Sequence, residues 1–170
     1  MSENAKGAAL ITGAAQRIGR VIAIELARQG RPIGVHYGAS KLAAEDTVNE
    51  IERAGGRAVA LGADLAREEQ VRALLPAAEA ALGPIDCLIN NAAAFERDSV
   101  ANATRASWDA HMETNLRAPF ILIQAMAERL PEGRTGNVIN ILDERVWNLT
   151  PHFVSYTLSK SALWTLTQTM

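Results

Sequence analysis

Short apolar segments of strand length alternate along this chain with longer segments of helical periodicity, and the pattern repeats about every 25 to 30 residues. Such alternation is typical of βαβ units, in which a helix carries the chain back between two parallel strands. The strand-like segments are almost continuously apolar, as in a parallel sheet that helices cover on both faces. The pattern predicts an α/β fold with a doubly wound parallel sheet, whose strands lie at residues 8–12, 32–37, 58–62, 86–90 and 137–142.

The segments between these strands carry apolar side chains on one face, as helices packed on a sheet do. A longer helix is expected from about residue 105 to 130, and a last helix begins near Phe153 and continues to the end of the sequence. No linker, repeat or low-complexity segment interrupts the series, so residues 1–170 are expected to form a single domain. Because the last helix has no further strand to reach, we expect the last one or two strands of the fold to be missing, about 60 to 80 residues.

The composition excludes several classes of protein. Of the 170 residues, 48% are hydrophobic and 21% are charged, and no apolar run approaches the roughly 18 residues that a membrane helix needs. The 17 basic and 19 acidic side chains leave a net charge of −2, which provides no basic surface for nucleic acid or an anionic membrane. The single cysteine, Cys87, cannot form an internal disulfide, and the first residues lack the features of a signal peptide. We therefore expect a cytoplasmic protein that binds a small molecule, without a metal site.

The first motif, TGAAQRIG at residues 12–19, follows the first expected strand and opens the first expected helix. Gly13 suits a tight turn, Gly19 permits close packing of the helix on the sheet, and the free N–H groups of the helix start favour a phosphate. Arg17 adds a guanidinium that binds a phosphate through two parallel hydrogen bonds. We expect Gly13, Arg17, Ile18 and Gly19 to contact a cofactor; the alternatives are an ordinary strand-to-helix turn and an exposed arginine without a role.

The ends of the second and third strands favour NADP over NAD. No Asp or Glu follows the second strand to bind a ribose 2′-hydroxyl, whereas Ser40 and Lys41 offer a hydroxyl and a cation that suit a 2′-phosphate. Tyr37, at the end of that strand, is expected in the same cofactor site. Asp64 and Leu65 follow the third strand, where the carboxylate either accepts a hydrogen bond from an adenine amino group or caps the next helix.

The fourth strand ends in small residues near the expected switch point of the sheet, where a ligand ring can approach the backbone. Asn91 and Ala92 are therefore expected to contact the cofactor. Phe95 follows and either offers a flat apolar face at the mouth of the site or packs as an ordinary aromatic side chain over the core.

Asn115 and Pro119 belong together in the long helix. Pro119 lacks an N–H, so the carbonyl of Asn115, four residues earlier, loses its helical partner. Such a carbonyl needs water or a ligand. The alternative is a proline that only bends the helix.

Tyr156 and Lys160 lie four residues apart, and therefore on one face if the last helix includes them. The ammonium group is then expected to lower the pKa of the phenol from about 10, so that the tyrosine passes a proton to a carbonyl or imine as a hydride arrives. Asp143 stands 13 residues before Tyr156, at the end of the fifth strand. It is an ionised acceptor that orients the phenol, a protonated carboxyl that joins in the transfer, or a strand end that pairs with Arg145.

Taken in this order, these residues resemble the short-chain dehydrogenase/reductase family over essentially the whole chain. The matching positions are Thr12, Gly13, Gly19, Asp64, Asn90, Asn91, Ala92, Asn115, Tyr156 and Lys160. The resemblance implies a Rossmann-type NADP-binding domain, of which residues 1–170 are the N-terminal two-thirds. It implies that Tyr156 is the proton donor, that Lys160 holds the nicotinamide ribose, and that the carbonyl of Asn115 anchors a water in the proton relay. Members of the family associate through the helices around residues 105–130 and from 153 onward, so a homodimer or homotetramer is expected.

Two departures resemble the pteridine-reductase branch of this family. Arg17 replaces the usual middle glycine of the cofactor loop, and Asp143 replaces the usual catalytic serine. In that branch the arginine binds the NADP phosphates and the substrate, and the aspartate acts with the tyrosine and the lysine. A phenylalanine at the position of Phe95 sandwiches the pterin ring against the nicotinamide. Ala93 departs from the branch, which commonly has a serine there.

The resemblance therefore predicts an NADPH-dependent reductase of a pterin, such as a dihydropteridine or dihydrofolate-like compound, or of a related carbonyl or imine. Its expected catalytic residues are Asp143, Tyr156, Lys160 and Asn115. Its expected substrate contacts are Arg17, Phe95, Asp143 and Tyr156. The alternatives are a 3-oxoacyl or other carbonyl reductase of the same family, and an inactive nucleotide-binding fragment or scaffold.

Overall fold

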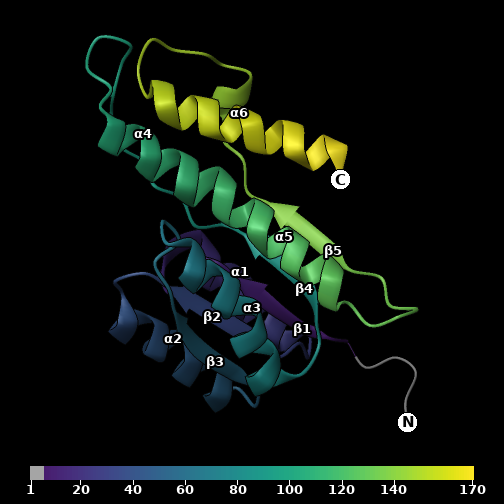
Figure 1. Cartoon of the computed structure of the whole chain (residues 1–170). Coiled ribbons are helices and arrows are strands. Elements are labelled where there is room, and N and C mark those ends of the chain that lie inside the picture. The colour runs from purple at the N-terminus through teal and green to yellow at the C-terminus, as the bar shows by residue number, and fades with distance from the viewer. Residues whose placement is uncertain (1–5) are drawn as a thin grey trace.

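The computed structural model describes residues 6–170, which form one parallel sheet with helices on both faces (Figure 1). The strands are β1 (Ala8–Ile11), β2 (Ile33–Tyr37), β3 (Ala58–Gly62), β4 (Ile85–Asn90) and β5 (Asn137–Asn140). Their order is β3-β2-β1-β4-β5, and every neighbouring pair is parallel. The strand order reverses direction at β1, next to β4, as in doubly wound sheets. The predicted fold class is confirmed.

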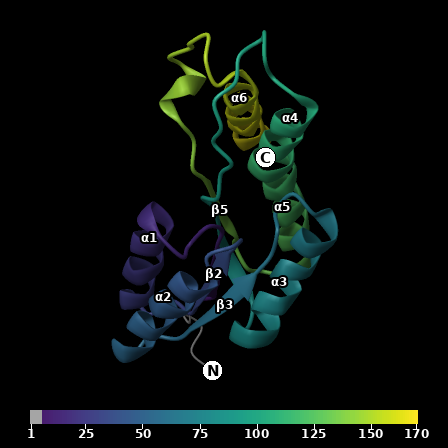
Figure 2. The same cartoon turned by 90° about the vertical axis from the view of Figure 1, so that its left-hand side faces the viewer.

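The helices form two layers around the sheet. They are α1 (Arg17–Arg28), α2 (Lys41–Arg53), α3 (Glu68–Leu82), α4 (Arg105–Met112), α5 (Ala118–Arg129) and α6 (Val154–Thr169). Leu10 of β1 faces the core formed with α3 and α5, whereas its neighbour Ile11 faces the core formed with α1 and α2. Figure 2 shows these two pairs of helices on opposite sides of the sheet. Because both faces are covered, the central strand β1 is apolar at every position rather than at alternate ones.

The long helix predicted for residues 105–130 is divided by a wide turn, η1 (Glu113–Arg117), between α4 and α5. In this turn the N–H of Ala118 donates to the carbonyl of Glu113, five residues back. The proline that follows, Pro119, has no N–H to continue the four-residue pattern, which accounts for the position of the interruption. α6 packs along α4 and η1, on the side away from α3 (Figure 1). Within residues 6–170, no helix is long and apolar enough to cross a membrane.

Two strands end earlier than predicted. β1 stops at Ile11, because Gly13 turns the chain with φ +64°. β5 stops at Asn140, after which the chain leaves the sheet toward the short helix η2 (Glu144–Val146), although the N–H of Ile141 still donates to the carbonyl of Asn90 at 2.9 Å. Both departures place the following residues in loops at the carboxyl edge of the sheet.

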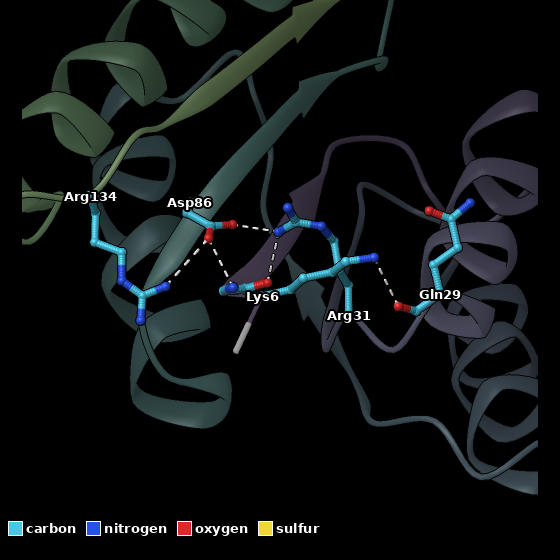
Figure 3. A network of polar contacts seen from close by, with 6 residues as sticks. Lys6, Gln29, Arg31, Asp86 and Arg134 are labelled. Carbon is cyan, nitrogen blue, oxygen red and sulfur yellow. Dashed lines mark hydrogen bonds and ion pairs between the residues drawn. The ribbon is translucent and has the colours of Figure 1, made fainter. Parts of the chain in front are cut away.

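A polar network at the opposite edge joins the starts of several strands (Figure 3). The carboxylate of Asp86, in β4, accepts a hydrogen bond from the N–H of Gly7 at 2.8 Å and pairs with Arg31, which precedes β2. Arg31 also donates to the carbonyl of Gly7 at 2.8 Å, and Arg134, before β5, lies 3.8 Å from Asp86. A Cβ at Gly7 would stand 2.4 Å from Asp86 Cγ, so this contact requires glycine. Asp86 of β4 therefore contacts residues that precede β1, β2 and β5, at the amino-terminal ends of the strands.

We predict that Asp86→Asn lowers the free energy of unfolding by about 1–3 kcal/mol, because the two guanidinium groups lose a largely buried counter-charge. Asp109→Asn is the matched control, since Asp109 pairs with Arg105 within one exposed helix face. That variant should change the free energy by less than about 0.5 kcal/mol. Urea unfolding followed by circular dichroism measures both. Equal small losses in the two variants would show that Asp86 does not fix the strand starts.

Candidate active site

Two adjoining cavities, of about 490 and 480 Å³, lie at the carboxyl ends of the strands, where ligands bind in doubly wound folds. The first gathers most of the predicted site residues: Gly13, Arg17, Ile18, Gly19, Tyr37, Ser40, Asn91, Ala92, Phe95, Asp143, Tyr156 and Lys160. Asp64 and Leu65 line the second cavity instead, and Gly13 and Ala92 border both. Of the predicted residues, Asn115 lines neither.

The loop after β1 is held closely against the end of β4. The hydroxyl of Thr12 accepts hydrogen bonds from the N–H groups of Asn91 and Ala92, each at 3.0 Å. The side-chain amide of Asn91 donates to the carbonyls of Thr12 and Gly13 at 2.9 and 3.1 Å. A Cβ at Gly19 would stand 2.4 Å from the carbonyl oxygen of Gly13 and 2.5 Å from Asn91 Nδ2. Gly19 is thus required by the loop itself, and not only by the packing of α1 on the sheet.

Arg17 begins α1 in a left-handed conformation, with φ +53°, which costs a residue with a side chain about 1–2 kcal/mol. A glycine adopts this conformation freely, and it is therefore the residue that the backbone alone would favour here. The preceding residue, Gln16, makes no side-chain cap, and the first turn of α1 contains no acidic residue. Arg17, Ile18 and Gly19 of that turn border the first cavity, and free N–H groups at a helix start together with a guanidinium suit an anion.

His36 is a site residue that sequence reasoning missed. It is buried in β2, where its Nδ1 accepts a hydrogen bond from the N–H of Gly13 and its Nε2 lies 3.0 Å from the carbonyl of Ala63. Burial lowers the pKa of His36 and outweighs the opposing effect of the Ala63 hydrogen bond. The neutral ring, protonated at Nε2, ties together the ends of the first three strands. A histidine within an otherwise apolar strand segment was the only signal in the sequence.

The structure clarifies the predicted role of Asp64. The N-cap of α3 is Arg67, so the alternative that Asp64 caps the helix is wrong. Its Oδ1 instead accepts a hydrogen bond from the N–H of Ala66 at 2.9 Å, which shapes the loop along the second cavity. Ser40 is the N-cap residue of α2, but its hydroxyl makes no capping hydrogen bond and so stays available to a ligand.

Asp143, Tyr156 and Lys160 meet on one wall of the first cavity. The phenol of Tyr156 donates a hydrogen bond to Asp143 Oδ2 at 2.9 Å, and the ammonium of Lys160 donates to the carbonyl of Ile141 at 2.8 Å. The second carboxylate oxygen, Oδ1, accepts from the backbone N–H of Arg145 at 3.0 Å. Both oxygens of Asp143 therefore act as acceptors, which suits the ionised form. The contact with Arg145 comes from its backbone, not from a guanidinium pair.

The electrostatics of this trio differ from the prediction. Burial raises the pKa of Tyr156, and the hydrogen bond to Asp143 and the charge of that carboxylate raise it further. Burial lowers the pKa of Lys160 to about 8, against the opposing effect of Asp143. The predicted lowering of the phenol's pKa by Lys160 is therefore wrong for this structure, because burial and the adjacent carboxylate both favour the protonated phenol.

Phe95 borders the first cavity and packs against other rings rather than over the core. It is 53% exposed, stacks on Phe153 with ring centroids 4.6 Å apart, and meets Tyr156 edge-on at the same distance. The guanidinium of Arg145 lies 4.7 Å from the centroid of the Phe153 ring. Phe153 was missed as a neighbour of the site, because no local pattern links the two phenylalanines.

Asn115 lies fully buried in the wide turn η1. Its Oδ1 accepts from the N–H of Ala94 at 2.8 Å, and its Nδ2 donates to the carbonyl of Ala94 and to the hydroxyl of Ser159, each at 3.0 Å. The side chain therefore joins the loop after β4 to α6. The role predicted for its backbone carbonyl stays a prediction.

A cavity bordered by an uncapped helix start, a lysine and a hydrogen-bonded tyrosine can hold an anionic cofactor and deliver a proton to a neighbouring molecule. Comparison with known proteins agrees with this geometry. The sequence pattern of the family described as short chain dehydrogenase matches residues 7–170.

Individual relatives give the same result. The chain is 32% identical to a short-chain type dehydrogenase/reductase of Picea abies, covering 94% of this chain and 62% of that protein. It is also 32% identical to the 3-oxoacyl-[acyl-carrier-protein] reductase FabG of Staphylococcus epidermidis, covering 95% and 66% of the two chains. The crystal structure of FolM alternative dihydrofolate reductase 1 from Brucella canis, complexed with NADP, superposes with a TM-score of 0.93 at 43% identity, over 96% of this chain and 66% of that one. The chain thus spans about two-thirds or less of these relatives, and it belongs to the short-chain dehydrogenase family.

Proposed function

We propose that this chain forms the cofactor-binding and catalytic part of an NADPH-dependent reductase that acts on a pterin, a dihydropteridine or dihydrofolate-like compound. The observation that carries the proposal is that one cavity is lined by Arg17, Phe95, Asp143, Tyr156 and Lys160. The likeness to an NADP complex of a dihydrofolate reductase from Brucella canis supports it. Within the family, this is the pteridine-reductase branch.

NADP(H) fits the cradle that the residues form. Gly13, Ile18 and Gly19 leave the start of α1 open and uncapped toward the cavity, and Arg17 adds a cation there. Tyr37 and Ser40 border the same cavity at the end of β2, where a 2′-phosphate would find a hydroxyl and no repelling carboxylate. Asp64 and Leu65 of the second cavity, Asn91 of the first and Ala92, which borders both, complete the set proposed to hold the cofactor. When bound, the cofactor supplies the hydride.

The chain's own residues supply the proton. Tyr156 is proposed as the donor, because a phenol is protonated at neutral pH even at its ordinary pKa of about 10. Its raised pKa makes the phenol a weaker acid, so donation depends on a cation that stabilises the phenolate. Asp143 orients the phenol through the 2.9 Å hydrogen bond and offers its charge to a basic or N–H-bearing ring, which a pterin has and a simple ketone lacks. Lys160, on the same wall, is proposed to stabilise the phenolate that proton donation leaves behind and to hold the cofactor ribose. Asn115 is proposed to support this proton relay through its backbone carbonyl.

A 3-oxoacyl thioester is the second candidate substrate, because FabG of Staphylococcus epidermidis is 32% identical to this chain. Asp143 distinguishes the two candidates. A carboxylate beside the phenol repels a developing oxyanion, whereas it attracts a protonating ring nitrogen.

Several further proposals concern the whole protein. We propose a cytoplasmic enzyme that assembles as a homodimer or homotetramer through α4, α5 and α6, on which Trp108, Phe120 and Leu158 are partly exposed. Exposed apolar side chains on a continuous helical layer fit such an interface.

The substrate proposal predicts that the protein oxidises NADPH in the presence of dihydrofolate or an unconjugated dihydropterin faster than with acetoacetyl thioesters.

Tyr156→Phe should lower kcat by about 100-fold or more while the NADPH dissociation constant stays within about twofold, since only the proton donor is lost. Phe95→Ala should raise the pterin KM by about 3- to 10-fold through loss of ring stacking. The rate of NADPH oxidation, followed by absorbance at 340 nm, gives kcat and KM, and fluorescence titration gives the NADPH dissociation constant. Efficient thioester reduction without pterin reduction would favour the second candidate.

Replacement of Arg17 separates its charge from its strained backbone. Arg17→Gly should weaken NADPH binding about tenfold or more, and NADH binding less, while it raises the free energy of unfolding by up to about 1 kcal/mol through relief of the positive φ. Arg17→Ala, the matched control, should lose the same affinity without the gain in stability. Fluorescence titration and urea unfolding give the two quantities. If NADPH and NADH affinities fell equally, Arg17 would not contact the 2′-phosphate.

The charge of Lys160 should make cofactor binding depend on pH. Its pKa of about 8 means that the ammonium is present below that pH and is lost above it, so NADPH affinity should fall by up to about tenfold between pH 7 and 9.5. Lys160→Met should bind NADPH weakly at every pH, without this step. Persistence of the step in Lys160→Met would assign the titration to another group.

A further inference from the structure

Three buried polar residues lie behind the catalytic wall and belong to neither cavity: Asp98, His111 and Ser155. They come from the loop after β4, from α4, which follows that loop directly, and from the first turn of α6, which lies far from both in the sequence. His111 and Ser155 are fully buried, and Asp98 is 3% exposed. Buried polar groups of this kind are costly unless each is paired, so their arrangement requires an explanation.

Hydrogen bonds connect the three residues in one direction. The N–H of Glu96 donates to Nε2 of His111 at 3.0 Å, so the ring proton is on Nδ1. Nδ1 lies 2.6 Å from the hydroxyl of Ser155, which in turn donates to Oδ2 of Asp98. Burial would raise the pKa of Asp98, but hydrogen bonds from Ser155 and from the N–H of Val154 outweigh it and lower that pKa. Every donor of the network thus finds an acceptor, with His111 neutral and Asp98 ionised.

Asp98 also supplies the cap that α6 lacks. The N-cap residue, Phe153, has a left-handed backbone with φ +60° and makes no side-chain cap. Asp98 replaces that cap from another segment, because its Oδ1 accepts from the N–H of Ser155 at 3.2 Å and its carbonyl accepts from the N–H of Phe153 at 2.8 Å. A carboxylate at this position also complements the positive end of the helix.

The network contacts residues of the reaction site on two sides, at Tyr156 and at the Phe95–Phe153 pair. Tyr156 directly follows Ser155, and its ring meets that of His111 edge-on at 5.9 Å. Phe95 lies three residues before Asp98, and its ring stacks on Phe153, which is bonded to Asp98 through its N–H. The same three residues therefore contact both the segment that carries the phenol and the stacked ring pair.

We propose that Asp98, His111 and Ser155 are positioning residues, which hold the Tyr156 phenol and the Phe95–Phe153 pair in the geometry that reduction requires. The kinetic part of this inference rests on the proposed function, whereas its structural part concerns only the hydrogen bonds and the phenol. None of the three touches the cavities, so their loss should affect the proton transfer more than cofactor binding.

The first test is spectroscopic and needs no substrate. Long-range ¹H–¹⁵N correlation spectra of the histidines should show His111 protonated at Nδ1 and His36 protonated at Nε2, two opposite tautomers that serve as references for each other. With ¹³Cζ-labelled tyrosine, Ser155→Ala should shift the resonance of Tyr156 and leave that of Tyr37, the only other tyrosine, in place. An Nε2-protonated His111, or an unmoved Tyr156 resonance, would overturn the inference.

The second test is kinetic. Ser155→Ala should lower kcat for pterin reduction by about 10- to 100-fold with the NADPH dissociation constant within twofold, because small displacements of a reacting group have large effects on rate. Ser161→Ala, which removes a hydroxyl of the same helix outside the network, should leave both unchanged. Equal kcat values in the two variants, or parallel losses of kcat and cofactor affinity, would overturn the positioning role.

A pair of substitutions at His111 covers the case in which Ser155→Ala destabilises the fold. His111→Asn keeps a donor near the position of Nδ1 and should retain most of kcat, whereas His111→Gln places its amide near Nε2 and should lose it. The reverse order would contradict the direction of the hydrogen bonds. If the wild-type protein reduced no pterin while the spectra agreed with the predicted tautomers and the Tyr156 shift, the proposed function would fail and the network would stand.

Discussion

The contact between the carboxyl ends of β1 and β4 is the constraint on which the site depends. One hydroxyl, that of Thr12, accepts two backbone N–H groups of the opposite loop, and one amide, that of Asn91, donates to two carbonyls in return. The close approach leaves no room for a Cβ at Gly19. Because these bonds satisfy the loop's own polar groups, the N–H groups at the start of α1 remain free for a ligand. His36 extends the same restraint to the third strand.

The chemistry of the site follows from where β5 ends. A longer β5 would place Asp143 in a regular strand. Instead the chain turns into η2, and the two carboxylate oxygens of Asp143 accept hydrogen bonds from the Tyr156 phenol and from the N–H of Arg145. Burial and this carboxylate raise the pKa of the phenol, so the phenol holds its proton more tightly and donation would depend on a nearby cation such as Lys160. The same charge opposes the lowering of the pKa of Lys160 by burial. A serine at this position would exert neither effect, which is why the identity of residue 143 bears so directly on the class of substrate.

Behind this wall, side-chain hydrogen bonds and one backbone bond, from the N–H of Phe153 to the carbonyl of Asp98, hold the loop after β4 against α6. Asn115 binds both polar groups of Ala94 and the hydroxyl of Ser159 from the wide turn that precedes Pro119. Asp98 and His111 act in the same way around Ser155, one helical turn earlier. The loop that carries Phe95 is thus tied to the helix that carries Tyr156 at two levels, and both ties are shielded from water.

Local patterns in the sequence determined the alternation of strands and helices, the parallel sheet, and the pairing of Tyr156 with Lys160 on one helix face, because these depend on residues near one another along the chain. They also located most of the residues that line the first cavity. Only the tertiary structure decided the tautomer of His36, the raised pKa of Tyr156, and the joining of Asp98, His111 and Ser155. Each of these depends on partners 13 to 57 residues away in sequence, and on a degree of burial that no local pattern specifies.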